Sequence, residues 1–146
     1  MANPETLANY DPAAVVASFG DIDIQGYADG TFLEVEHEED SFTKKVGSTG
    51  AATRVMNRNR SGKITITLMH AAPTNDLLMA KYREDRATGL AYKAFQVKDL
   101  HGNMRCKAAE CWIMKAPKIE RAKDAVHTVW VFECANLDID AGGNLV

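Results

Sequence analysis

The chain has 146 residues, 46% of them hydrophobic and 25% charged, and its formal net charge is −3. This length suits one domain with a single core, and the composition excludes disordered and fibrous classes of protein. Because 17 basic residues are outnumbered by 20 acidic ones, the charge balance argues against tight, general DNA binding, which depends on basic groups that neutralise phosphates. The sequence shows no repeat or linker, so we treat residues 1–146 as a single domain.

The start of the chain and its apolar runs indicate neither secretion nor membrane insertion. Residues 1–12 lack the basic and apolar regions of a signal peptide. The apolar runs fall far short of the ~18 residues that cross a bilayer. The three cysteines are an odd number, so we expect reduced thiols in a protein made in the cytoplasm.

Apolar and polar residues alternate with a period of two through most of the chain, which predicts strands that bury one face. The first strand is expected from Ala14 to Phe19. A Gly20-Asp21 turn then joins it to residues 22–24 and predicts a hairpin.

Two further stretches alternate most clearly. In residues 32–40, one face carries Leu33, Val35 and His37, and the other carries an acidic stripe of Glu34, Glu36, Glu38 and Asp40. In residues 63–68, isoleucine and leucine occupy one face, and the other carries Lys63, Thr65 and Thr67. Both patterns predict strands with one buried and one solvated face.

Glycines and polar residues between these two strands predict a mobile loop, which comprises Lys44, Lys45, Val46, Gly47, Ser48, Thr49 and Gly50. A further strand over residues 52–57 gives a long hairpin with an extended tip. Basic residues follow the loop closely: Arg54, Arg58, Arg60 and Lys63. No aromatic residues interleave with them to stack on bases, so pairing with acidic neighbours, within or between subunits, explains them better than single-strand binding.

One segment predicts a helix. It begins at Pro73 and Thr74, with Thr74 as the N-cap, and Gly89 ends it. Its expected apolar stripe is Leu77, Leu78 and Tyr82, and its expected outward residues are Lys81, Glu84 and Asp85.

Beyond the helix, strands are expected over residues 94–98, 105–114 and 126–134, with a turn at residues 101–103. The total is about eight strands and one helix. The sequence therefore predicts a mainly-β fold, a β-sandwich or barrel with one flanking α-helix.

The cysteines do not have the spacing of a metal site. Zinc ligands usually occur as pairs at short fixed gaps, whereas four residues separate Cys106 from Cys111. A regular strand turns these two side chains to opposite faces. We expect Cys106, Cys111 and Cys134 to be buried, unreactive thiols.

A catalytic site is not indicated either. The four histidines, His37, His70, His101 and His127, are scattered, and no serine lies in a nucleophile elbow. Residues 47–50 contain glycines but lack the lysine and the following helix of a phosphate-binding loop. We expect no enzymatic activity, no metal and no cofactor.

Several segments form an extended pattern rather than a short motif. They are Gly-Tyr-Ala-Asp-Gly-Thr-Phe at 26–32, Glu-Asp-Ser-Phe-Thr-Lys at 39–44, Arg-Ser-Gly-Lys-Ile-Thr-Ile-Thr-Leu at 60–68 and Thr-Asn-Asp-Leu-Leu at 74–78. Together they resemble the tail tube proteins of contractile-tailed phages. The resemblance is close in the first half of the chain, and in the second half it lies mainly in the strand order.

This resemblance implies a tail-tube-like β-sandwich that assembles as a homo-oligomer, in hexameric rings stacked into a hollow tube. The protein would be a structural subunit of the virion, in the phage tail, assembled in the host cytoplasm. Its partners would be the tail sheath, baseplate and tape-measure proteins. Double-stranded DNA would pass transiently, without specific binding, and no membrane is involved.

The same resemblance suggests roles for the polar residues. Glu34, Glu36 and Glu38 would line the lumen and keep DNA off the wall, with Thr65 and Thr67 as weaker candidates. The loop at residues 44–50 would order against the neighbouring ring. The basic residues Arg54, Arg58, Arg60 and Lys63 would pair between subunits.

Two alternatives remain open at this point. One is the tube protein of a related contractile injection or secretion system, which passes effectors instead of DNA. The other is a small monomeric β-sandwich that binds a ligand, which predicts an apolar pocket and a protein that stays monomeric at high concentration.

Overall fold

The computed structural model describes residues 10–124 and 126–143. Within these ranges the chain forms β1 (Val15–Phe19), β2 (Ile22–Asp23), β3 (Leu33–His37), β4 (Phe42–Val46), β5 (Ala52–Met56), β6 (Gly62–Met69), α1 (Thr74–Thr88), β7 (Lys93–Asp99), β8 (Met104–Ile113), β9 (His127–Cys134) and β10 (Leu137–Ala141). A short 3-10 turn, η1 (Pro12–Ala14), precedes β1. The predicted mainly-β fold with one flanking helix is confirmed. The expected count of about eight strands missed β4 and β10.

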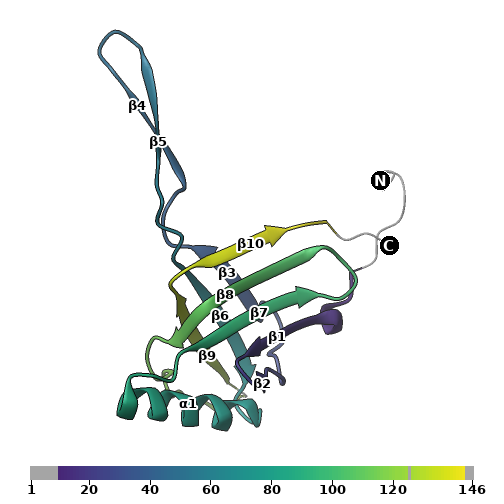
Figure 1. The fold of residues 1–146 in the computed structure, drawn as a ribbon. Helices are drawn as coiled ribbons and strands as arrows, with labels where there is room; N and C mark the ends of the chain where they lie inside the picture. Colours follow the sequence, from purple (N-terminus) through teal and green to yellow (C-terminus); the bar gives the residue numbers. More distant parts are fainter. Residues whose placement is uncertain (1–9, 125, 144–146) are drawn as a thin grey trace.

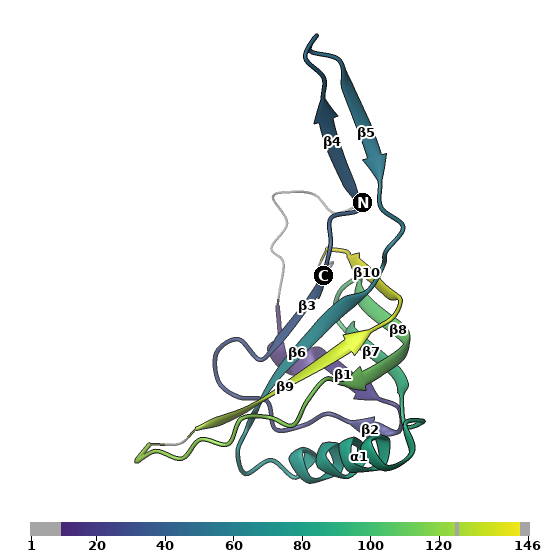
Figure 2. The same ribbon diagram turned by 90° about the vertical axis from the view of Figure 1, so that its left-hand side faces the viewer.

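Eight of the strands form one sheet, in the order β2-β1-β7-β8-β9-β6-β3, with β10 also paired to β8. The first half of β8 pairs with β10, through Met104–Ala108, and its second half pairs with β9, through Cys111–Ile113. At this branch the sheet folds over, so that β3, β6 and β9 form one layer and β10, β8, β7 and β1 form the other (Figures 1 and 2). The core lies between the two layers.

The inward faces of both layers supply this core. Ile64, Ile66 and Leu68 of β6 are fully buried, as their alternation predicts. Phe132 of β9 lies at ring-centroid distances of 5.1 Å from Phe19 and 4.9 Å from Phe95, so one aromatic cluster joins three strands. Tilted and edge-on aromatic contacts of this kind add to the free energy gained from burial alone.

A β-bulge in β8 overturns one prediction. Lys93 pairs with Cys111 but Phe95 pairs with Ala108, so two residues of β8 face one residue of β7. The extra residue shifts the alternation of inward and outward side chains by one position. Cys106 and Cys111 therefore both point into the core, at 3% and 0% exposure. The expectation of opposite faces was wrong because it assumed a regular strand. The expectation of buried thiols holds for all three cysteines.

The helix α1 starts differently from the prediction. Pro73 is the N-cap residue, and Thr74 is the first helical residue, so Thr74 is not the cap. Its hydroxyl instead accepts a hydrogen bond of 3.1 Å from the backbone N–H of Gln25. The predicted end is confirmed, since Gly89 adopts the left-handed conformation with a φ of 69°.

The predicted apolar stripe of α1 is partly wrong. Leu78 is fully buried and Tyr82 packs against the core, but Leu77 is 51% exposed. Of the residues expected to face outward, Glu84 is exposed, whereas Lys81 and Asp85 are half-buried. The Lys81 ammonium lies 4.0 Å from the Asp21 carboxylate and 3.6 Å from that of Glu84.

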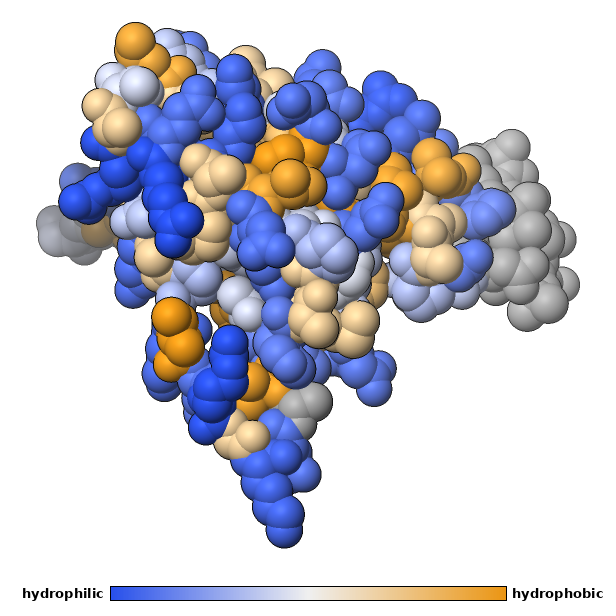
Figure 3. Space-filling model, turned by 90° about the horizontal axis from the view of Figure 1, so that it is seen from below, coloured by the Kyte–Doolittle hydropathy of each residue, from blue (hydrophilic) through white to orange (hydrophobic). Residues whose placement is uncertain are grey.

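Viewed from the end of the body that carries α1, apolar side chains are dispersed among polar ones (Figure 3). The helix has 15 residues. Among the described residues, no helix has the length and apolar character needed to cross a membrane.

Candidate assembly surfaces

The hairpin β4–β5 projects away from the two-layered body (Figures 1 and 2). Lys44, Lys45 and Val46 belong to β4 and pair with Arg54, Thr53 and Ala52 of β5, so the prediction of a mobile loop over residues 44–50 is wrong for its first three residues. Residues 47–50 form the turn, closed by a 2.8 Å hydrogen bond from the Gly47 N–H to the Ala51 carbonyl. The two strands satisfy each other's backbone groups, which a loop would leave to water.

Every residue of β4 and β5 is exposed, including apolar ones. Phe42, Val46 and Met56 lie on one face of the hairpin at 48%, 60% and 60% exposure, and Val55 lies on the other face at 40%. A two-stranded hairpin alone in water is marginally stable. Exposed apolar side chains that line a projection are typical of a surface that binds another protein.

A carboxylate fixes the root of the hairpin. Glu39 accepts hydrogen bonds from the side-chain amides of Asn57, at 2.8 Å, and Asn59, at 3.0 Å. The side-chain oxygen Oδ1 of Asn57 accepts from the Asn59 backbone N–H, and Oδ1 of Asn59 accepts from the Ser61 backbone N–H. The donated bonds from Asn57 and Asn59 hold the pKa of Glu39 below its usual value. Together they join the segment before β4 to the segment after β5.

The four predicted basic residues do not form one patch. The Arg54 guanidinium lies on the hairpin, 3.9 Å from the ring centroid of Phe42, in a cation–π contact. Arg58 and Arg60 are exposed at the hairpin root. Lys63 lies on β6, opposite Glu36 of β3.

The acidic stripe lies on the outer face of the β3–β6–β9 layer. Glu34 is opposite Thr65, and Lys63 separates Glu36 from Glu133 of β9. The structure therefore brings the predicted Glu34, Glu36, Thr65 and Thr67 onto one face, but with a lysine among the carboxylates. Glu38 follows the end of β3 and is exposed. Glu133 was missed by the sequence analysis, although it alternates with the buried residues of β9.

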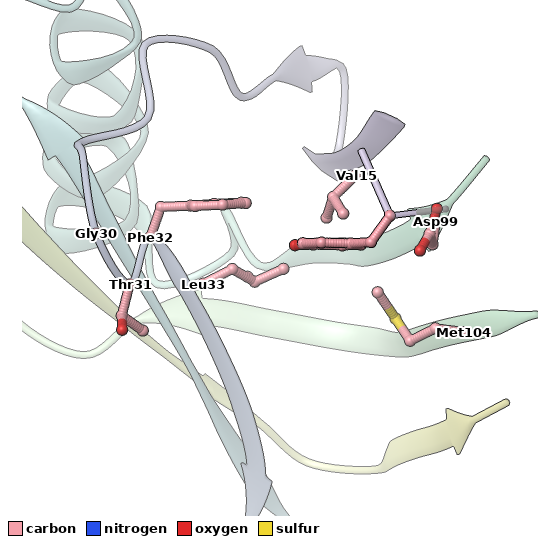
Figure 4. A pocket seen from close by; sticks show the side chains of 8 residues that line it. Val15, Gly30, Thr31, Phe32, Leu33, Asp99 and Met104 are labelled. Carbon is pink, nitrogen blue, oxygen red and sulfur yellow. The ribbon is translucent and has the colours of Figure 1, made fainter. Parts of the chain in front are cut away.

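A hollow of about 390 Å³ opens at one end of the sandwich (Figure 4). Phe32 and Leu33 approach it from the start of β3, and Val15 and Met104 from the other layer. The carboxylate of Asp99, which is buried, accepts a 3.0 Å hydrogen bond from the His101 N–H at its edge. An apolar pocket is the feature that the ligand-binding alternative predicts. The four apolar residues named above, which line this hollow, also belong to the core or pack against it.

In the described part of the chain, no three His, Cys, Asp or Glu side chains are grouped closely enough to hold a metal ion. The described surface offers two features suited to contacts with other molecules: a projecting hairpin with exposed apolar side chains, and a sheet face that carries charged side chains.

Comparisons with known proteins agree with this geometry. A structural protein of Pseudomonas phage KPP10, ORF10, is 28% identical over 123 residues, which are 83% of this chain and 71% of that protein. Among solved structures, the tube-terminating cap of the anti-feeding prophage is 10% identical with a TM-score of 0.60, over 95% of both chains. A chain in the sheath/tube terminator of PVC, an extracellular contractile injection system, is 11% identical with a TM-score of 0.62, over 91% of this chain and 97% of that one.

A chain of the PVC sheath-tube complex is similar to the same degree, with a TM-score of 0.59 and 10% identity over 91% of this chain and 92% of that one. At these identities the structures establish the fold alone. The sequence family is more specific, because residues 12–142 match the bacteriophage PhiTE tail tube protein family across nearly the whole described chain. The chain therefore belongs to this family of phage tail tube proteins.

Proposed function

We propose that this protein forms hexameric rings that stack into the tube of a phage tail, through which double-stranded DNA is ejected. The observation that carries the proposal is the projecting hairpin β4–β5, whose apolar side chains Phe42, Val46 and Met56 stay about half exposed or more in the described part of the subunit. A neighbouring subunit in a tube provides that partner. Residues of the strands and the turn, 44–50, contact the next ring.

Open strand edges support assembly around a ring. Within the described residues, β3 pairs only with β6 and β10 pairs only with β8. Apart from the Leu137 N–H, which donates to the Arg60 carbonyl at 2.8 Å, each strand therefore presents backbone donors and acceptors along an edge that no other described strand covers. Such an edge is the feature that pairs with another chain. Pairing between subunits satisfies these groups, and stacking of rings in a head-to-tail contact extends the assembly into a filament.

The outer face of β3–β6–β9 is the proposed wall of the lumen. Glu34, Glu36 and Glu38 contribute negative charge, Thr65 and Thr67 contribute neutral polar surface, and Lys63 moderates the field between Glu36 and Glu133. In a ring of six this face repels DNA phosphates at short range, because charges are screened over ~8 Å at physiological ionic strength. DNA passes without specific binding.

The basic residues fit contacts between subunits. Arg54 is displayed on the hairpin, and Arg58 and Arg60 lie at its root, where they can meet carboxylates of an adjacent subunit. We propose a contractile tail with sheath, baseplate and tape-measure proteins as partners, a virion location, and assembly in the host cytoplasm. The similarity of fold to chains in sheath-tube complexes supports the sheath as a partner.

Negative-stain electron microscopy of the purified chain, concentrated near neutral pH, tests the proposal. Wild type is compared with the double variant Phe42→Ser/Met56→Ser, which removes apolar surface from the hairpin only. The matched control is Leu90→Ser, which removes an apolar side chain that is 73% exposed on the body.

We expect stacked rings with sixfold end views for wild type and Leu90→Ser. The double variant should give no tubes while its circular dichroism spectrum is unchanged, since neither residue packs on the body. Normal tubes from the double variant would remove the role of the hairpin. Failure of wild type to assemble, even on a supplied baseplate, would overturn the tube and favour the ligand-binding alternative.

A further inference from the structure

Two of the three cysteines face each other across neighbouring strands. Cys111 of β8 and Cys134 of β9 are directly opposite, and their sulfur atoms lie 3.0 Å apart. Both side chains are buried, at 0% and 2% exposure. This proximity follows from the bulge in β8, which turns Cys111 inward.

The backbone around this pair has the geometry of a cross-strand disulfide. Hydrogen bonds from the Ala135 N–H to the Glu110 carbonyl, at 3.2 Å, and from the Met114 N–H to the Val131 carbonyl, at 3.0 Å, set the ladder. They leave Cys111 and Cys134 in a non-hydrogen-bonded pair, where Cα atoms are ~4.5 Å apart. Disulfides form at Cα separations of about 4.4–6.8 Å, and a separation typical of such a pair falls within this range.

The third cysteine is placed differently. Cys106 lies opposite Val97 of β7 and Ile139 of β10, with no cysteine across from it. A buried cysteine in this core therefore does not necessarily have another cysteine within reach. Cys106 provides a natural internal control.

We infer that Cys111 and Cys134 form a latent disulfide that staples β8 to β9 when the folded protein meets a peroxide. The seam that it closes, where β8 pairs with β9, is short. The register covers three residue pairs, Cys111 with Cys134, Trp112 with Glu133, and Ile113 with Phe132, with one backbone hydrogen bond beyond each end. This seam joins the two layers of the sandwich. A covalent bond there ties the layers together.

The reaction is a two-electron oxidation by hydrogen peroxide. One thiolate attacks a peroxide oxygen, so an S–O bond forms, the O–O bond breaks and, with a proton, water leaves. The second thiol attacks the resulting sulfenic acid, so the S–S bond forms, the S–O bond breaks and a second water leaves. The two sulfurs supply the two electrons, and brief opening of the short seam admits the oxidant.

The two sulfurs are not equivalent. The hydrogen bond that the two thiols share lowers the pKa of Cys134, and together with burial it raises the pKa of Cys111. Either thiol can start the reaction, and the lower pKa favours Cys134 for the attack on the peroxide.

The test uses the purified, folded full chain with and without hydrogen peroxide, followed by denaturation, alkylation and mass spectrometry. Trypsin separates the cysteines into peptides 106–107, 108–115 and 124–146. We expect the oxidised protein to contain 108–115 linked to 124–146, with Cys106 alone alkylated. The oxidised form should melt about 10 °C higher, as expected for closure of a short loop in a domain of this size.

The variant Cys106→Ala should give the same link and the same rise in melting temperature, whereas Cys111→Ala should give neither. If Cys111→Ala does not fold, the peptide map of wild type still decides. Alkylation of all three thiols in wild type after peroxide treatment overturns the inference. So does a link that contains Cys106, or one that forms only in denaturant.

Discussion

The indole Nε1–H of Trp130 donates a hydrogen bond of 2.8 Å to the side-chain oxygen of Asn75. Trp130 is fully buried in β9, and Asn75 lies in the first turn of α1. The Asn75 amide group also donates to the carbonyls of Met69 and His70, at 3.0 and 3.3 Å. One side chain thus attaches the helix to both β9 and the end of β6.

This relationship predicts that Asn75→Ala destabilises the fold. The substitution leaves a buried indole N–H without its acceptor, which costs about 1–3 kcal/mol. Chemical denaturation should show a lower midpoint with an unchanged slope. Leu77→Ala is the control in the same helix, because Leu77 is exposed and its loss should change the unfolding free energy little. Equal stability of the two variants would show that the Asn75 contact contributes nothing.

The close packing around Gly62 predicts that a larger residue at this position destabilises the fold. A Cβ atom at this position would lie 2.6 Å from the Glu36 carbonyl oxygen and would also meet the Leu137 side chain. The backbone of β3 and the first residue of β10 therefore leave no room for an alanine side chain at position 62. Gly62→Ala should lower the unfolding free energy by about 1–3 kcal/mol, the usual cost of overpacking.

The control for Gly62 is Gly47→Ala in the hairpin turn, where the nearest atom to an added Cβ is 3.7 Å away. Thermal unfolding of both variants checks the prediction. A melting temperature for Gly62→Ala equal to that of Gly47→Ala would mean that β3 moves freely to accommodate the methyl group.

The sequence predicted the buried strands because burial imposes a pattern on them. β6 and β9 each alternate buried residues with half-buried or exposed ones, and their expected bounds differ from the structure by at most one position at either end. β4 has no such pattern, since all five of its residues are exposed. Its pairing with β5 therefore left no alternation of buried and exposed residues in the sequence from which the strand could be predicted.

The candidate surfaces were only partly predictable, because alternation shows which residues of one strand share a face but not which strands are neighbours. The face shared by Glu34 and Thr65 follows from alternation in two separate strands, but their register requires the pairing of β3 with β6. Alternation could not reveal the bulge opposite Ala94, and so could not reveal the pairing of Cys111 with Cys134. A local insertion in one strand changes every inward side chain that follows it.

Glu39 predicts a dependence of the hairpin root on pH. Its pKa in the folded protein is lowered by the bonds from Asn57 and Asn59, so it lies below the unfolded value of about 4.3. The contribution of these bonds is therefore complete above that value and is lost as the pH falls through the folded pKa. The NMR signals of the Asn57 side-chain amide should titrate with a midpoint below about 4.3.

In Glu39→Gln this titration should disappear, whereas Glu34→Gln should leave it unchanged, since Glu34 lies on the sheet face. A midpoint at or above the ordinary value of glutamate would contradict the proposed hydrogen-bonded root.

Charge reversal on the proposed lumen wall is the most direct test of how DNA passes. In Glu34→Lys/Glu36→Lys, six subunits per ring would attract phosphates instead of repelling them. Ejection of DNA from variant particles should slow, and more so at low ionic strength, because screening lengthens from ~10 Å at 0.1 M to ~30 Å at 0.01 M salt. Glu120→Lys, at an exposed position outside the sheet, is the matched control. Equal ejection rates for both variants at low salt would place Glu34 and Glu36 away from the path of the DNA.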